Sequence, residues 1–495
     1  MQIDAGEGAS SVSTAPRDAV SARMQRRAET ALFWSVLIAV ALMTLPIAGA
    51  RQWSSSLGAV AIGLSAFAYA LCVIFAGSRI EVPMRKLWAP GVLIALPVAW
   101  ALVQTFPIAQ SALTHPLWIS SNEVLHRSVS GRISIDPHAT GTALMRLLLH
   151  VAVFYLAVQL CRSSERAFFA LAGIVVIGTA DALYRPLLAQ LGALADPPAS
   201  AWTGETADPL FVGLSLLAAI ALLAKLVHGP AVRSPDWRTL GSALLRIARS
   251  SAWAPAIAVF ILLGIALGTH SGSELMAAAL GVATLLIALI SASKAGRIGY
   301  RITVALALVS AMTVIGLAGL LVLGGRESGR RVAGPASEIR SPIEEALAAA
   351  PLLGHGYGTF DVAFPIYADE PHDGGADWEP NVYLKLAFEL GLPAAAMLIL
   401  AIAWVTLRCA LGLYTRRRDI VYPALGVAAA IAAGSYALVG SGPAPSVAAL
   451  LALILGMGYS QSWASSEALR ITRSRDLGGN GMRPADQRST GAAPG

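Results

Sequence analysis

Charged residues are scarce in this sequence. Asp, Glu, Lys and Arg make up 13% of its 495 residues, whereas hydrophobic residues make up 56%. A soluble globular domain carries about 25% charged residues. Most of the chain is therefore predicted to lie in lipid. The charge that remains is basic, at +7, and we assign this excess to holding loops on the cytoplasmic side of a membrane. Neither a zinc-finger spacing nor a stripe of basic and aromatic residues indicates a nucleic-acid partner.

Cysteine is rare as well. Cys72, Cys161 and Cys409 lie within or at the ends of apolar runs and share no motif. They predict neither a disulfide nor a metal site. The first 30 residues also lack the short apolar core and the small-residue cleavage site of a signal peptide. We therefore expect the first apolar run to act as an uncleaved anchor.

Long apolar runs are what the sequence has in quantity. A membrane-spanning helix needs about 20 apolar residues. Runs of this kind predict an all-α integral membrane protein with about twelve transmembrane helices. They begin near Ala31, Leu57, Trp88, Thr142, Ala167, Pro209, Ala252, Glu274, Ile302, Lys385, Ile420 and Ser446.

The chain is predicted to form one membrane domain, residues 31–463, between two tails. The tails, residues 1–30 and 464–495, are rich in Gly, Ser, Arg and Asp and are expected to be disordered. With the N-terminus inside, every second connecting segment is basic, so both termini are predicted to be cytoplasmic. Residues 324–384, between the ninth and tenth spans, then form a large periplasmic loop.

This loop contains several local signals. Residues 342–350 are predicted to form a short helix capped by Ser341. A glycine-dense turn, residues 354–358, follows it. His355 lies between two of these glycines and is interpreted as a turn residue. His372 is predicted to be more exposed, although a lone loop histidine is a weak catalytic signal.

Basic residues near the outer ends of the predicted helices are candidate ligands for a phosphate group, because guanidinium groups bind phosphate through paired hydrogen bonds. Together they could line one cationic pocket at the outer surface. Alternatively, each reaches the lipid headgroups, and Asp181 neutralises Arg185 four residues along the same helix. The candidates are Arg146, Arg185, Arg326, Arg330, Arg331 and Lys385.

Four stretches resemble the O-antigen ligase and O-antigen polymerase superfamily of bacterial envelope proteins. The most specific is Pro-Leu-Leu-Gly-His-Gly-Tyr-Gly-Thr-Phe at residues 351–360. Residues 381–393 are similar to the pattern His-Asn-x-Tyr-Leu followed by Glu-Leu-Gly-Leu-Pro. Residues 133–137 resemble the segment before the family's fourth helix, and residues 269–271 resemble the start of its eighth.

The resemblance implies transfer of a glycan from undecaprenyl pyrophosphate on the periplasmic face of the bacterial inner membrane. The product would be O-antigen, exopolysaccharide or capsule, and envelope polysaccharide assembly proteins are possible partners beside the membrane lipids. It implies no metal or cofactor. The basic candidates would hold the pyrophosphate, and His372 is the candidate to act as catalytic base in place of the family's loop histidine. The loop motif would comprise Gly354, Gly356, Gly358, Asn381 and Tyr383.

The sequence departs from the family pattern in three places. Residues 203–208, before the predicted sixth span, contain no arginine where the pattern has one. Gly272 stands where the pattern has an arginine, and Pro380 stands where it has a histidine. A second hypothesis is therefore a relative without catalysis, which binds lipid-linked glycan or scaffolds the assembly machinery. A third is a transporter or flippase, although no pair of Gly- or Pro-interrupted helices in corresponding halves supports it.

Overall fold

A computed structural model shows a protein built from α-helices. Within the parts of the chain that it describes, the only β-pairing is an isolated bridge between Ile108 and Gly131. The described residues are 15–44, 51–75, 82–108, 114–126, 130–193, 208–228, 253–269, 272–293, 345–367, 381–415, 419–438 and 442–463.

Seven helices in these ranges contain a segment long and apolar enough to cross a membrane. They are α1 (Ala15–Thr44), α2 (Arg51–Phe75), α3 (Met84–Thr105), α5 (Pro137–Leu160), α6 (Ser164–Ala193), α7 (Pro209–His228) and α15 (Leu392–Thr415). Four further apolar helices are shorter: α9 (Trp253–Thr269), α10 (Gly272–Ser293), α16 (Val421–Tyr436) and α17 (Pro445–Gln461).

Large apolar side chains on the surface show what surrounds these helices. On α2, Leu64 and Phe67 are each 63% exposed, and Ile74 is 71% exposed. Such side chains are stable when their surroundings are lipid. The prediction of a membrane-embedded helical protein is thus confirmed at this level.

The predicted apolar runs fall on helices, except for the ninth, near Ile302, which lies outside the described residues. The number of twelve spans and the periplasmic side of the large loop stay predictions.

The predicted start of the tenth span is wrong. Lys385 lies in a separate short helix, α14 (Val382–Leu390), and the spanning helix α15 begins only at Leu392. Gly391 separates them with a φ of +79°, a backbone conformation that glycine adopts readily and that ends an α-helix. Lys385 is therefore outside the apolar span.

Part of the predicted N-terminal tail belongs to a helix. Helix α1 begins at Ala15, so residues 15–30 are helical. The stretch before the apolar run contains Ala, Arg, Met, Gln and Glu, which are good helix formers even where they are polar. Residues 1–14 and the predicted tail 464–495 lie outside the described residues.

The core is built on close contacts between small residues. Helix α16 packs against α7, α10, α15 and α17, and eight of its 16 residues are alanine or glycine. A Cβ atom on Gly458 of α17 would lie 3.1 Å from the carbonyl oxygen of Tyr422. Small residues allow helix backbones to approach this closely in a membrane.

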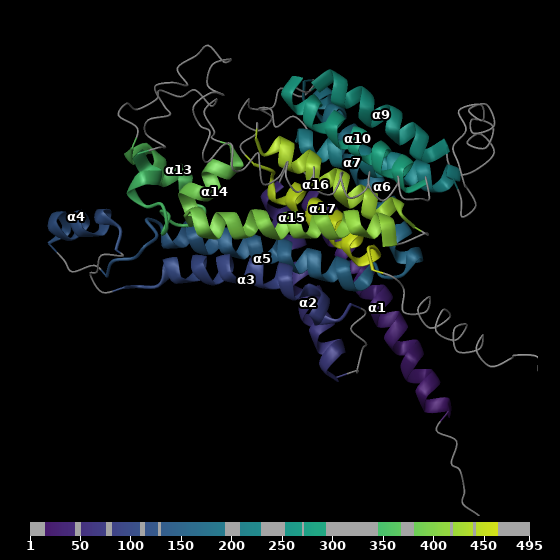
Figure 1. The fold of residues 1–495 in the computed structure, drawn as a ribbon, viewed down its shortest axis with the longest axis horizontal. Coiled ribbons are helices and arrows are strands. Elements are labelled where there is room, and N and C mark those ends of the chain that lie inside the picture. The colour runs from purple at the N-terminus through teal and green to yellow at the C-terminus, as the bar shows by residue number, and fades with distance from the viewer. Residues whose placement is uncertain are drawn as a thin grey trace, which may run out of the picture.

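Helices α3, α5 and α15 run lengthwise beside one another (Figure 1). At one end of this layer, on the left of Figure 1, lie the short elements α4 (Pro116–Leu125), α13 (Phe360–Ala363) and α14. A 3-10 turn, η6 (Phe364–Ile366), directly follows α13. Three of the four segments that carry the family resemblance, residues 133–137, 351–360 and 381–393, meet at this end.

Candidate functional site

The centre of the candidate site is a glycine turn, residues 353–359, at the C-terminal end of α3. Gly354, Gly356 and Gly358 have φ angles of +69°, +114° and +77°. Residues with a Cβ atom rarely adopt these values, whereas glycine does so at little cost. Alternate glycines thus give this stretch a shape that other residues would resist.

The glycine turn pairs with the end of α14 through backbone groups. The N–H of His355 donates to the Phe388 carbonyl at 3.0 Å, and that of Gly356 donates to the Glu389 carbonyl at 3.0 Å. The N–H of Leu392 donates to the Pro351 carbonyl at 2.9 Å. The two motif stretches at 351–360 and 381–393 therefore form one unit.

Close approaches explain why the turn contains glycines. A Cβ atom on Gly354 would lie 2.3 Å from the Glu389 carbonyl oxygen. One on Gly356 would lie 2.4 Å from Ser134 Oγ, and one on Gly358 would lie 2.5 Å from the Cβ of Ala143. Such distances are far below van der Waals contact, so a larger residue would force the segments apart.

Two side chains from α3 fasten this unit to the membrane helices. The amide nitrogen of Gln104 donates to the carbonyls of Leu353 at 2.8 Å and Glu389 at 3.1 Å, while its oxygen accepts from the N–H of Tyr357 at 3.1 Å. The indole N–H of Trp100 donates to Leu390 O at 3.0 Å and Leu353 O at 3.3 Å. Gln104 is fully buried, and every polar atom of its amide has a partner.

The segment before α5 closes the other side of the turn. Asp136 caps α5 by accepting from the backbone N–H groups of His138 and Ala139. Ile135 donates its N–H to the carbonyl of His355 at 3.0 Å. Ser134 Oγ lies 2.8 Å from the hydroxyl of Thr140. All three segments that resemble the family on this side of the molecule are in contact.

His355 lies in the turn, as predicted, and its side chain is buried there. It is 1% exposed and stacks on Phe388 with ring centroids 4.2 Å apart. Its Nδ1 lies 3.1 Å from the Phe388 carbonyl and its Nε2 lies 2.9 Å from the Tyr367 hydroxyl. Burial lowers the pKa of His355, so the ring is neutral. A carbonyl accepts only, so Nδ1 carries the proton and Nε2 accepts from Tyr367.

Glu389 is the second buried ionisable side chain bonded into the turn. It is 3% exposed, and its Oε1 accepts the N–H of Phe360 at 3.3 Å. Burial raises the pKa of Glu389 to about 7, although backbone N–H groups of Gly358 and Phe360 oppose the shift. The carboxyl group therefore gains and loses its proton near neutral pH.

We expect Glu389→Gln to change how stability depends on pH. Because the folded-state pKa lies above the ordinary value of 4.5, the wild-type fold loses stability as pH rises from 4.5 to about 7, by at most about 3 kcal/mol. Glutamine has the same shape and stays neutral, so the variant should melt at a higher temperature than wild type at pH 8 and at a similar one at pH 5. Thermal melting in detergent measures this, with the exposed Glu123→Gln as control. Identical pH profiles for Glu389→Gln and wild type would contradict the assignment.

Two of the predicted basic ligands reach this end of the molecule. Arg146 is exposed on α5. Burial and the charge of Glu389 raise the pKa of the Tyr357 hydroxyl to about 12, and the nearby Arg146 opposes this rise. Lys385 Nζ lies 3.5 Å from Asp361 Oδ1 and 5.3 Å from the centre of the Phe360 ring. The structure thus brings both cations near the glycine turn.

The structure does not describe the side chains of the other predicted basic ligands or of His372. Arg185 lies in α6 immediately after the apolar span, and its side chain is not among those described. Arg326, Arg330, Arg331 and His372 lie outside the described residues, as does Pro380. One pocket holding all the basic candidates therefore stays a prediction.

Asn381 and Tyr383 prove to hold α14 in place. The Asn381 side chain caps the helix by accepting from the N–H of Leu384 at 2.9 Å. The Tyr383 hydroxyl donates to the Gly434 carbonyl at 2.9 Å, and the N–H of Val382 donates to Ala437 O at 3.0 Å. These loop-motif residues position the turn against α16.

Sequence reasoning did not single out Trp100, Gln104, Ser134 or Glu389 as individual residues of the site. One signal was present for Gln104: a neutral polar residue near the end of an apolar run needs hydrogen-bond partners once it is buried. Nothing local identifies those partners.

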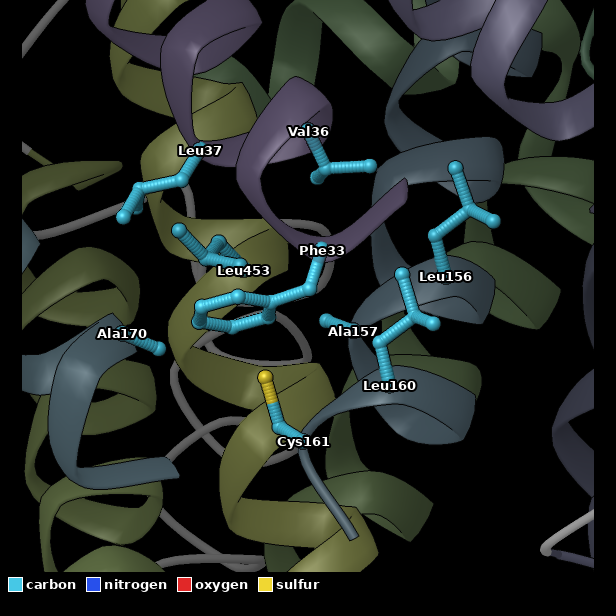
Figure 2. Close-up of a pocket in the computed structure, with 9 residues that line it drawn as sticks. All are labelled: Phe33, Val36, Leu37, Leu156, Ala157, Leu160, Cys161, Ala170 and Leu453. Carbon is cyan, nitrogen blue, oxygen red and sulfur yellow. The ribbon is translucent and has the colours of Figure 1, made fainter. Parts of the chain in front are cut away.

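A small pocket elsewhere in the molecule is apolar. It lies between α1, α5, α6 and α17, and its side chains point toward one another in Figure 2. It is lined by Phe33, Val36, Leu37, Leu156, Ala157, Leu160, Cys161, Ala170 and Leu453. No charged group lines it, so it does not suit a pyrophosphate.

Comparison of the sequence with models of protein families gave no match, and comparison with curated proteins gave none either.

Proposed function

We propose that this protein is an inner-membrane glycan polymerase or ligase, which transfers sugar chains from undecaprenyl pyrophosphate during assembly of O-antigen, exopolysaccharide or capsule. One observation carries the proposal. Three of the four stretches that resemble the family, at 133–137, 351–360 and 381–393, join into one hydrogen-bonded unit, although 133–137 is far from the other two in the sequence. That unit lies at the end of a membrane helix layer, with Arg146 and Lys385 beside it.

In the proposed reaction, an acceptor hydroxyl oxygen bonds to the anomeric carbon of the carrier-linked sugar. The bond from that carbon to the pyrophosphate oxygen breaks, and the leaving group takes the electron pair. Arg146, Arg185 and Lys385 stabilise its growing negative charge. His372 accepts the proton of the hydroxyl.

A second candidate is binding of the lipid-linked glycan without transfer. The observation that favours it is that His355 and Glu389, the two buried titratable side chains bonded into the turn, are 1% and 3% exposed. Both are bonded to the protein, so neither can reach an acceptor hydroxyl in this arrangement. Catalysis then depends on a base outside the turn.

Purified full-length protein in nanodiscs tests the proposal. We expect it to release undecaprenyl pyrophosphate from a carrier-linked oligosaccharide and to lengthen or transfer the glycan. Arg146→Ala should lower the rate about 100-fold or more, because one electrostatic contact to the leaving group is lost. Arg27→Ala removes an exposed arginine in the first half of α1, far from the turn in the sequence, and should retain the wild-type rate.

If wild type and both variants bind the carrier-linked glycan but release no undecaprenyl pyrophosphate, the second candidate, binding without transfer, is favoured over the transferase. Neither binding nor release would contradict both.

A further inference from the structure

Four chain segments meet at the end of the α3–α5–α15 layer opposite the glycine turn. Lys86 lies in the first turn of α3, whereas Gln104 lies at its other end. Arg162 directly follows the end of α5, and Arg408 lies on the C-terminal part of α15. Trp463 follows α17. We call Lys86, Arg162, Arg408 and Trp463 the Trp463 cluster. The cluster is separate from the candidate site described above.

Three cations contact Trp463 in this cluster, two of them over its indole ring and one at its backbone carbonyl. The guanidinium carbon of Arg408 lies 3.5 Å from the centre of the Trp463 ring, and Lys86 Nζ lies 4.4 Å from it. Arg162 donates from Nη1 to the carbonyl of Trp463 at 2.9 Å and to that of Ser460 at 2.6 Å. The contacts with the aromatic face are favourable, but they leave three positive charges close together.

No carboxylate of the described residues forms an ion pair with Lys86 or Arg408. The Nε atom of Arg408 is buried without an acceptor among those residues. The carbonyls at the ends of α5 and α17 account for Arg162, since helix C-termini attract cations. They do not account for Lys86, because the first turn of α3 is the positive end of its helix dipole. An anion at the cluster would remove this excess of charge.

The surface beside the cluster is apolar and aromatic. Trp88, two residues beyond Lys86, is 66% exposed, and Trp404, one turn before Arg408, is 43% exposed. Met84, on the same turn of α3 as Lys86, is 60% exposed. Tryptophan is enriched where membrane helices meet the headgroup layer. A ligand for this region needs a negative head and an apolar body.

We propose that the Trp463 cluster binds the phosphodiester headgroup of an anionic phospholipid, with its acyl chains along Trp88 and Trp404. Basic pockets between membrane helices bind such headgroups, and arginine pairs with phosphate oxygens by parallel hydrogen bonds. The orientation predicted from the sequence places this end of the helices at the cytoplasmic leaflet. The lipid would hold α3, α5, α15 and α17 together at the end of the helices opposite the glycine turn.

Native mass spectrometry of the full-length protein in detergent tests this. The probes are dioctanoyl phosphatidylglycerol, dioctanoyl phosphatidylcholine and inorganic phosphate. We expect phosphatidylglycerol to bind well and the other two weakly. Lys86→Gln and Arg408→Gln should each weaken phosphatidylglycerol binding about fivefold or more. Arg85→Gln removes the neighbouring exposed arginine, which has no contact with the indole, and should change binding less than about twofold.

Thermal melting without added lipid shows whether each variant is folded. If Arg408→Gln does not fold, Lys86→Gln at the start of α3 decides the result. Phosphatidylglycerol binding that is unchanged in Lys86→Gln would overturn the proposal. Equal binding of inorganic phosphate and phosphatidylglycerol would overturn its lipid part, because the acyl chains would then contribute nothing.

Discussion

Gly354→Ala is expected to detach the glycine turn from α14. A left-handed backbone costs a residue with a Cβ about 1–2 kcal/mol. The new methyl group would also meet rigid backbone, because the Glu389 carbonyl oxygen lies 2.3 Å and the Gly391 nitrogen 2.6 Å from its position. The hydrogen bonds from His355 and Gly356 to α14 would lengthen or break. We expect a total loss of about 3 kcal/mol or more.

Limited trypsin digestion measures this opening locally, since Lys385 lies within α14. Cleavage after Lys385 should become faster in the variant, and the melting temperature should fall. The matched control is Gly141→Ala in the first turns of α5, where no atom lies within 4 Å of the added methyl group. Alanine is a better helix former than glycine, so the control should be neutral or slightly stabilising. Equal digestion rates for Gly354→Ala and the control would show that the turn accepts a Cβ.

Gln104→Leu is the second substitution with a large expected effect. Leucine fills a similar volume but removes three hydrogen bonds to the backbone. The Leu353 carbonyl retains Trp100 and the Glu389 carbonyl retains Gly356, whereas the N–H of Tyr357 is left buried without its acceptor. Such an orphaned donor costs about 1–3 kcal/mol, and each lost bond costs about 1 kcal/mol. We expect a destabilisation of about 3 kcal/mol.

Chemical or thermal unfolding in detergent, compared with Thr105→Ala, measures this effect. The hydroxyl of Thr105 is exposed and bonds only to Leu102 of its own helix, so the control should lie within about 0.5 kcal/mol of wild type. A Gln104→Leu protein as stable as the control would mean that the amide does not fasten the turn to α3.

Local signals in the sequence predicted much of the helical framework. The helices could be predicted from apolar runs because the length of a run and the spacing of its residues are local properties of the sequence. The glycine-dense stretch was predicted as a turn, and His355 as a turn residue, because alternating glycines are themselves a backbone signal. The break before α15 was missed because one glycine, Gly391, hardly alters the hydropathy of the run around it.

The fastening of the site could not be predicted in the same way. Gln104 bonds to groups 249 and 285 residues further along the chain, and no pattern near Gln104 specifies them. The pKa of Glu389 depends on its burial and on backbone hydrogen bonds from Gly358 and Phe360. Sequence spacing alone does not reveal these contacts. Lys385 was placed in a span because Gly391, which ends α14, hardly alters the hydropathy of the apolar run around it.

The hydrogen bonds of Gln104 also set an order of events during synthesis. Helix α3 emerges and enters the membrane long before Leu353 and Glu389 exist. Even then α14 is unsupported until Gly434 and Ala437 are made, because Tyr383 and Val382 bond to them. The glycine turn is therefore among the last parts to assemble. A chain released before α16 would have most of its apolar helices in the bilayer and no completed site.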